Sequence, residues 1–89
     1  MESQELEQRD GGGRVVQRGR LVDGELDGEL VQLDAAGVVL AKMSYKRGKL
    51  DGESLFYDGG KLKVRLVYRD GLQQGEPILY GDDGTSLRK

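Results

Sequence analysis

The chain has 89 residues, 36% of them hydrophobic and 34% charged, and its formal net charge is −2. It contains no His, Cys or Trp, which excludes Ser-His-Asp and Cys-His nucleophiles, Cys/His zinc sites, iron–sulfur clusters and disulfides. No apolar run approaches the about 20 residues that span a bilayer, and no large basic segment favours nucleic-acid binding. We therefore expect one small cytoplasmic domain that binds no nucleic acid and needs no cofactor or metal.

The first twelve residues differ from the rest of the chain. They hold four acidic residues against a single Arg9 and end in glycines. Polar segments of this kind at a chain terminus are commonly mobile. The sequence predicts a flexible acidic and glycine-rich tail over residues 1–12 and a folded domain over residues 13–89.

The folded part contains a repeat. A Gly-x-x-x-Gly-Glu motif begins at Gly24, Gly48 and Gly71, and each copy has a Leu or Tyr four residues after its Glu. Repetition at such a period is typical of arrays in which each unit is stabilised by its neighbours. It predicts a half-unit at 13–20 and three units at 21–44, 45–67 and 68–89.

Each unit is expected to contain two strands. Residues 61–68 alternate polar and apolar side chains, as a half-buried strand does, and residues 38–45 and 14–21 are their equivalents. Shorter strands are predicted at 29–33, 53–57 and 76–80, with Asp-Gly hairpin turns between the runs. We predict an all-β fold, an antiparallel meander of about six or seven strands in a single curled sheet without a helix.

The alternation also predicts which side chains form the core. Leu62, Val64, Leu66 and Tyr68 point one way, together with their equivalents in the other long strands. From the short strands we expect these residues to join them: Val31, Leu33, Leu55, Tyr57, Ile78 and Tyr80. All four tyrosines would then be core residues. The sheet must cover its apolar face by curling, by closing partly, or by pairing with a second copy of the chain, so a homodimer is one expected assembly.

The middle unit resembles a known repeat. The run Tyr45-x-x-Gly48-Lys-Leu-Asp-Gly52-Glu53, followed by Tyr57, Gly60-Lys61 and Tyr68, is similar to MORN-type repeats, and looks closest to the bacterial MORN-variant repeats of the YwqK-type antitoxin family. The resemblance covers residues 13–89 and implies β-hairpins laid side by side. It also implies an antitoxin, protein-binding or scaffold role, with membrane phosphoinositide contact in some eukaryotic members. The chain departs from the MORN pattern because it has no Trp, and Leu replaces Tyr at Leu21 and Leu33.

The repeated glutamates are one candidate site. Glu29, Glu53 and Glu76 are equivalent, which would suit a metal ion or a basic partner. Neighbouring units lie two strands, or about 9.6 Å, apart, which is too far for two of them to share one calcium ion. We expect each Glu instead to cap a turn or to pair with a neighbouring cation.

A basic stripe is the second candidate. Arg18, Lys42, Arg65 and Lys89 occupy equivalent positions on the sheet face opposite the core, with Lys61 and Lys63 beside them. Phe56 has the opposite parity to Tyr57 and is expected to be exposed near them, with Leu30, Leu40 and Leu79. The predicted partner-binding residues are Arg18, Lys42, Phe56, Lys63 and Arg65. The alternative is a solvated face that carries charges of both signs.

These features favour a non-enzymatic protein–protein interaction module, antitoxin-like or scaffold. The alternative is peripheral association with anionic lipid through the basic sheet face. No catalytic, cofactor-binding or metal-binding residues are predicted, because a thin meander offers little depth for the pocket that acid–base chemistry by Glu, Asp, Tyr or Lys would need.

Overall fold

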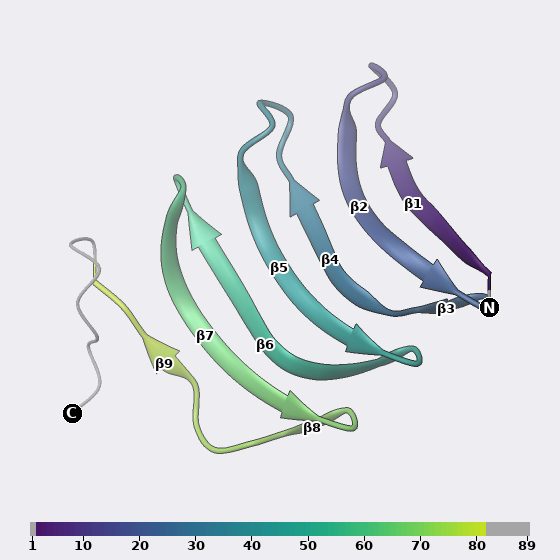
Figure 1. The fold of residues 1–89 in the computed structure, drawn as a ribbon. Helices are drawn as coiled ribbons and strands as arrows, with labels where there is room; N and C mark the ends of the chain where they lie inside the picture. The colour runs from purple at the N-terminus through teal and green to yellow at the C-terminus, as the bar shows by residue number, and fades with distance from the viewer. Residues whose placement is uncertain (1, 82–89) are drawn as a thin grey trace.

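A computed structural model describes residues 2–81, and its strands form one antiparallel sheet (Figure 1). The strands are β1 (Ser3–Arg9), β2 (Val15–Val22), β3 (Glu25–Leu26), β4 (Gly28–Leu33), β5 (Val39–Lys46), β6 (Lys49–Asp58), β7 (Lys61–Arg69), β8 (Leu72–Gln73) and β9 (Ile78–Leu79). Their order in the sheet is β1-β2-β4-β5-β6-β7-β8, with β3 paired to β2 and β9 paired to β7. The prediction of an all-β meander is confirmed, and no helix occurs within residues 2–81.

Three tight turns join the strands at one end of the sheet. In each, two consecutive residues adopt positive φ: 51° and 83° at Asp23-Gly24, 51° and 81° at Arg47-Gly48, and 51° and 82° at Asp70-Gly71. Positive φ at both central residues defines the type I′ turn, whose twist matches that of the flanking strands. The same turn therefore recurs once in every unit, at the first Gly of each sequence motif.

At the opposite end, the β1–β2 and β4–β5 turns are wider and are closed by an aspartate, whereas β6 and β7 are joined by a two-residue turn with φ of 60° at Gly59 and 83° at Gly60. The Asp34 carboxylate accepts hydrogen bonds from the backbone N–H groups of Ala36 (2.8 Å) and Val38 (2.9 Å). Asp10, which precedes Asp34 by one period, accepts the same bonds from Gly12 (2.8 Å) and Arg14 (3.0 Å). Such Asx turns allow a short polar side chain to replace backbone partners. The first hairpin is thus built like the second.

The prediction of a flexible tail over residues 1–12 is wrong for Ser3–Arg9. These residues form β1, which pairs antiparallel with β2 from Ser3↔Val22 to Arg9↔Val15. Glu5, Leu6 and Asp10 precede Glu29, Leu30 and Asp34 by the repeat period of the first two units. The repeat therefore extends to the start of the described chain, where the acidic composition conceals it. Residues 82–89 of the predicted unit 68–89 lie outside the described part.

Backbone contacts between successive units hold the array together. The N–H of Gly48 donates to the carbonyl of Leu26 (2.8 Å), and the N–H of Gly71 donates to the carbonyl of Leu50 (2.7 Å). Beside them, the Asp51 carboxylate accepts from the N–H of Asp70 at 3.3 Å. The tight turns at Gly48 and Gly71 are therefore each bonded to the unit before them, as the repeat model requires.

One face of the sheet carries no charged side chain in its three central rows, and we call it the uncharged face. Residues directly opposite in antiparallel strands lie on the same face, so the registers define three rows. The middle row is Leu6, Gly19, Leu30, Met43, Ser54 and Leu66. The second row is Gln8, Gln17, Gln32, Ala41, Phe56, Val64 and Leu79. The third row is Gln4, Leu21, Leu26, Tyr45, Leu50, Tyr68 and Gln73.

The predicted phase of the short strands is wrong. Val31, Leu55 and Ile78 pair with Arg18, Lys42 and Arg65 on the other face, which we call the charged face. Leu33 and Tyr57 lie on this charged face too, two residues beyond Val31 and Leu55. The most buried side chains of the uncharged face are instead Leu30, Ala41 and Ser54, while Leu33 is buried on the charged face. Tyr45 and Tyr68 remain on the predicted core face.

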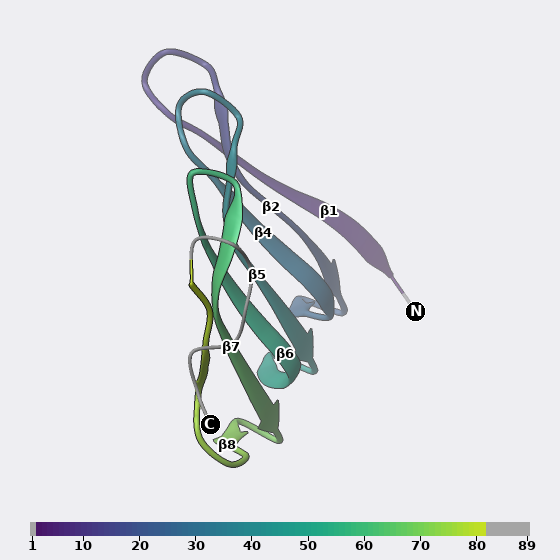
Figure 2. The same ribbon diagram turned by 90° about the vertical axis from the view of Figure 1, so that its left-hand side faces the viewer.

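The sheet is a single layer. Seen from its side in Figure 2, the curved strands stack behind one another without a second sheet or a helix over either face in residues 2–81. The principal extents of 43 × 34 × 15 Å agree with this shape. Both faces of the sheet are thus open to contact.

Candidate functional site

The charged face contains one continuous cross-strand row. Its members, in strand order, are Glu7, Arg18, Val31, Lys42, Leu55, Arg65 and Ile78. Cations and apolar residues alternate along the row from Arg18 onward. Three of the five predicted partner-binding residues, Arg18, Lys42 and Arg65, are therefore aligned across β2, β5 and β7. The cations stand two strands, or about 9.6 Å, apart.

The other two predicted residues do not join this row. Phe56 pairs with Ala41 and Val64, so it lies half-buried on the uncharged face rather than beside the cations. Lys63 sits at the bulge of β7, where the register passes from Phe56↔Val64 to Tyr57↔Leu62. Lys89, the fourth cation of the predicted stripe, lies outside the described residues.

Carboxylates accompany the cations on the charged face. Glu53 forms an ion pair with Arg65, which confirms the expectation that this glutamate pairs with a neighbouring cation. Glu7 forms an ion pair with Arg9 (Oε1 to Nη2, 2.6 Å), and Asp27 forms a longer one with Arg20 (Oδ1 to Nη2, 4.0 Å). The face as a whole is therefore close to neutral, because each unit contributes ions of both signs.

Two cations of the row remain unpaired. Among residues 2–81, neither Arg18 nor Lys42 has an ion-pair partner within 4.0 Å. They flank Val31, which pairs with Arg18 on one side and Lys42 on the other. This Arg18–Val31–Lys42 segment is the part of the charged face whose charges are not already satisfied within the described chain.

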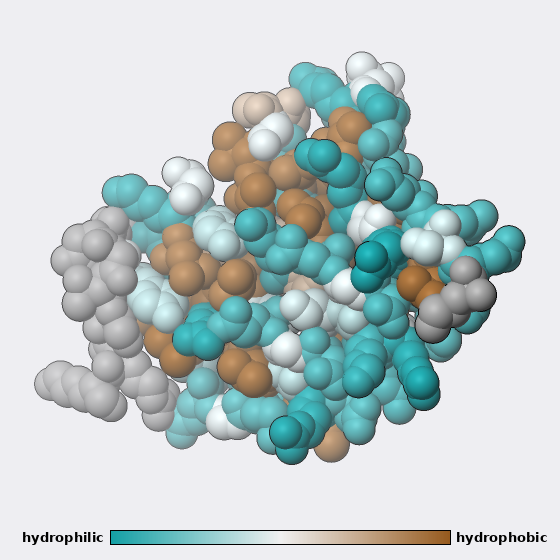
Figure 3. Space-filling view, viewed as in Figure 1, coloured by the Kyte–Doolittle hydropathy of each residue, from teal (hydrophilic) through white to brown (hydrophobic). Residues whose placement is uncertain are grey.

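A shallow groove of about 560 Å³ lies beside this segment. Its lining includes Arg18, Arg20, Glu29, Val31 and Leu33. Leu33 is only 8% exposed and gives the groove an apolar floor, while the charged side chains form its sides. Figure 3 shows this side of the sheet, where apolar areas are divided by hydrophilic side chains. An open groove of this kind suits a protein surface better than an enclosed small molecule.

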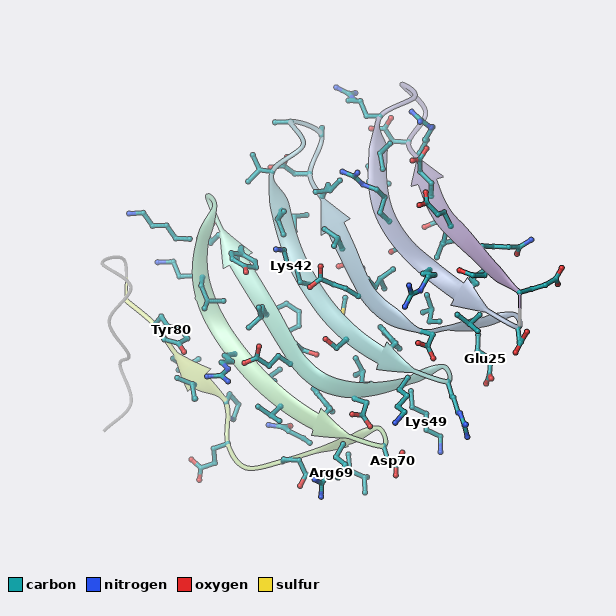
Figure 4. All side chains as sticks on the ribbon, viewed as in Figure 1. Glu25, Lys42, Lys49, Arg69, Asp70 and Tyr80 are labelled. Carbon is teal, nitrogen blue, oxygen red and sulfur yellow. The ribbon has the colours of Figure 1, made fainter. Side chains whose placement is uncertain are left out.

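A second basic cluster was not predicted from the sequence. Lys46, Arg47, Lys49 and Arg69 gather at the tight-turn end of β5, β6 and β7 with Asp51 and Asp70, around a depression of about 680 Å³. Figure 4 labels Lys49, Arg69 and Asp70 at this end of the sheet. The sequence contained a signal for this cluster, because Lys46, Arg47 and Lys49 surround one tight turn and Arg69 precedes the equivalent turn. Asp51 is directed to the backbone N–H of Asp70, so one of the two carboxylates is already engaged.

The carboxyl group of Asp10 has a lowered pKa, and its role is structural. The backbone N–H of Arg14 lowers the pKa of Asp10 below 3.8, with further help from the N–H of Gly12 and the Arg14 side chain, while desolvation opposes the shift. This group closes the first wide turn. No group of three or more acidic side chains in residues 2–81 is placed to hold a metal ion.

Comparison of the chain with models of protein families, with characterised proteins and with solved structures returned no match. Within residues 2–81, no helix is long and apolar enough to cross a membrane. The assignment of function therefore depends on the geometry of the two sheet faces and on the resemblance of the repeat motif.

Proposed function

We propose that this chain is a non-enzymatic protein-binding module, antitoxin-like or scaffold in type, and that the charged face is its binding surface. The similarity of the Gly-x-x-x-Gly-Glu units to MORN-type repeats supports the proposal. So does the single-layer sheet, which offers two broad surfaces.

The observation that carries the proposal is the Arg18–Val31–Lys42 segment. Arg18 and Lys42 lack ion-pair partners in the described chain, they are aligned on adjacent units, and an apolar residue separates them. Charged groups in such an arrangement give specificity and raise the association rate, while the apolar residue between them adds buried area. The partner expected here carries carboxylates about 9.6 Å apart around an apolar side chain.

The experiment is affinity capture from the native cell with charge-reversed variants. The wild-type chain is expected to retain a specific protein, and the double variant Arg18→Glu/Lys42→Glu is expected to lose it. Lys49→Glu is the matched control, because it changes the same charge at the tight-turn end, away from the Arg18–Val31–Lys42 segment. If both variants keep the protein, or if the wild type retains none, the charged face is not the binding surface.

Anionic lipid association is the second candidate, and the cluster of Lys46, Arg47, Lys49 and Arg69 favours it over the predicted stripe. Each cation near an anionic surface contributes about 1 kcal/mol, and the four cations of this cluster are accompanied by two carboxylates, those of Asp51 and Asp70. Flotation with vesicles that contain phosphatidylserine tests it. Salt-sensitive binding that Lys49→Glu weakens would support this function, and absence of binding at low salt would exclude it.

A further inference from the structure

We propose that the uncharged face binds a second copy of this chain, so that two sheets pack face to face as a symmetric dimer. The proposal is independent of the function of the charged face, which stays outward in the dimer. It starts from a composition that chance does not explain: the chain is 34% charged, yet its three uncharged rows contain no charged side chain. Charge returns where the hairpins turn at the far end of β1–β2 and β6–β7, at the ion pair Asp10–Arg14 and at the pair Asp58↔Lys61.

An uncharged centre with a charged rim is the composition of a protein interface. Charged residues are depleted from interface cores, and the rim remains polar. Antiparallel sheets that expose one face to water show the same division, with the uncharged face packed on another layer. In residues 2–81 that second layer is missing, because all strands belong to one sheet.

The exposed area has the size that a dimer needs. The chain exposes 6172 Å², whereas a compact monomer of 9.8 kDa exposes about 5,200 Å². The surplus of about 1,000 Å² is comparable to the about 800 Å² that each partner contributes to a stable interface. The radius of gyration of 14.4 Å also exceeds the about 12 Å expected for a compact chain of this length.

The chemistry of the face favours a second copy over a charged partner. A charge placed against the half-buried Met43, Phe56 or Leu66 would lose its hydration without gaining a counter-ion, which costs several kcal/mol. The occupant must therefore be uncharged over a comparable area, and the chain's own face meets this condition.

The distribution of glutamines sets the direction of the two-fold axis. In the second row, Gln8, Gln17 and Gln32 lie toward β1, and the Gln32 amide already donates to Gln17 at 3.3 Å. Phe56 and Val64 lie toward β9. A two-fold axis that crosses the strands along this second row places the glutamine half of the row on its copy and the apolar half on its copy. Amides then meet amides, and apolar groups meet apolar groups.

Sedimentation equilibrium on the full chain tests the dimer. The wild type is expected at twice 9.8 kDa, and either Gln17→Lys or Leu79→Lys is expected to weaken dimerisation at least about tenfold by burying a charge. Leu72→Lys is the matched control, since Leu72 is also an exposed leucine but pairs with Arg69 on the charged face. It should leave the dimer unchanged.

Circular dichroism of each variant confirms that the sheet is retained. If a variant unfolds, the mass of the wild-type protein still shows whether the chain forms a dimer. A wild type that stays at 9.8 kDa up to about 100 μM overturns the proposal. So does a mass above that of a dimer, or a dimer that Leu72→Lys dissociates as readily as Leu79→Lys does. These readouts use no variant of Arg18 or Lys42, so failure here leaves the protein-binding function untouched.

Discussion

Removing the hydroxyl of Ser54 is expected to stabilise the protein. Ser54 is 2% exposed, the most buried side chain described, and its Oγ has no hydrogen-bond partner. It lies in the middle uncharged row between Met43 and Leu66. A buried hydroxyl without a partner costs about 1–3 kcal/mol, whereas the loss of one oxygen atom's packing costs a few tenths of a kcal/mol. Ser54→Ala should therefore raise the free energy of unfolding by about 1 kcal/mol.

Thermal and urea unfolding measure this gain. For a domain of this size, about 1 kcal/mol corresponds to a rise in Tm of about 4–8 °C. The matched control is Ser44→Ala, which removes a hydroxyl from the half-buried Ser44 on the opposite face and should change stability by less than about 0.5 kcal/mol. A Ser54→Ala variant that is less stable than the wild type by about 1 kcal/mol would show that the hydroxyl has a partner, and would refute the reasoning.

Three further perturbations follow from the same structure. Leu30→Ala truncates a side chain that is 5% exposed, and it should lower the free energy of unfolding in urea by about 2–5 kcal/mol. Leu72→Ala truncates a side chain that is 69% exposed and should lower it by less than about 0.5 kcal/mol. Equal effects of the two variants would contradict the assigned burial. Gly48→Ala places a side chain on a residue with φ of 81° and should destabilise the protein by about 1–2 kcal/mol. Gly11→Ala adds a Cβ in open space and should leave the stability nearly unchanged. The prediction fails if Gly48→Ala also leaves the stability unchanged. The lowered pKa of Asp10 means that its carboxylate stabilises the fold above pH 3.8 and loses this contribution as the pH falls through its folded-state value. NMR titration should place the Asp10 pKa below 3.8, Asp10→Asn should reduce the loss of stability in acid, and a titration above 3.8 would contradict the assignment.

The sheet and its turns could be predicted because their signals are local. Glycine at Gly24, Gly48 and Gly71 is needed for positive φ, and alternation over 61–68 shows a long strand directly. The strand β1 was missed because its side chains are nearly all polar. Hydrophobic alternation cannot show an exposed edge strand, and only the spacing of Glu5 and Asp10 from Glu29 and Asp34 shows that the repeat includes it.

The facing of the short strands could not be read from composition. Leu30 and Val31 are both apolar, and Leu55, Phe56 and Tyr57 form an apolar run with no period of two. In such a run a shift of one residue exchanges the two faces without changing the pattern. Pairing with the longer strands decides the phase, and it places Ser54 and Gln32 inside while Val31 and Leu55 join the cations. The alignment of Arg18, Lys42 and Arg65 was predicted correctly despite this error, because all three residues belong to long strands.

The phase of β6 is the central claim, since both proposed surfaces depend on it, and side-chain NOEs measure it most directly. With isotope-labelled protein, the account predicts strong NOEs from the Phe56 ring to the Ala41 methyl group and to the Val64 methyl groups. It predicts none from the Leu55 methyl groups to Ala41. NOEs between Leu55 and Ala41, with Phe56 near the Lys42 side chain, would exchange the two faces and contradict the account.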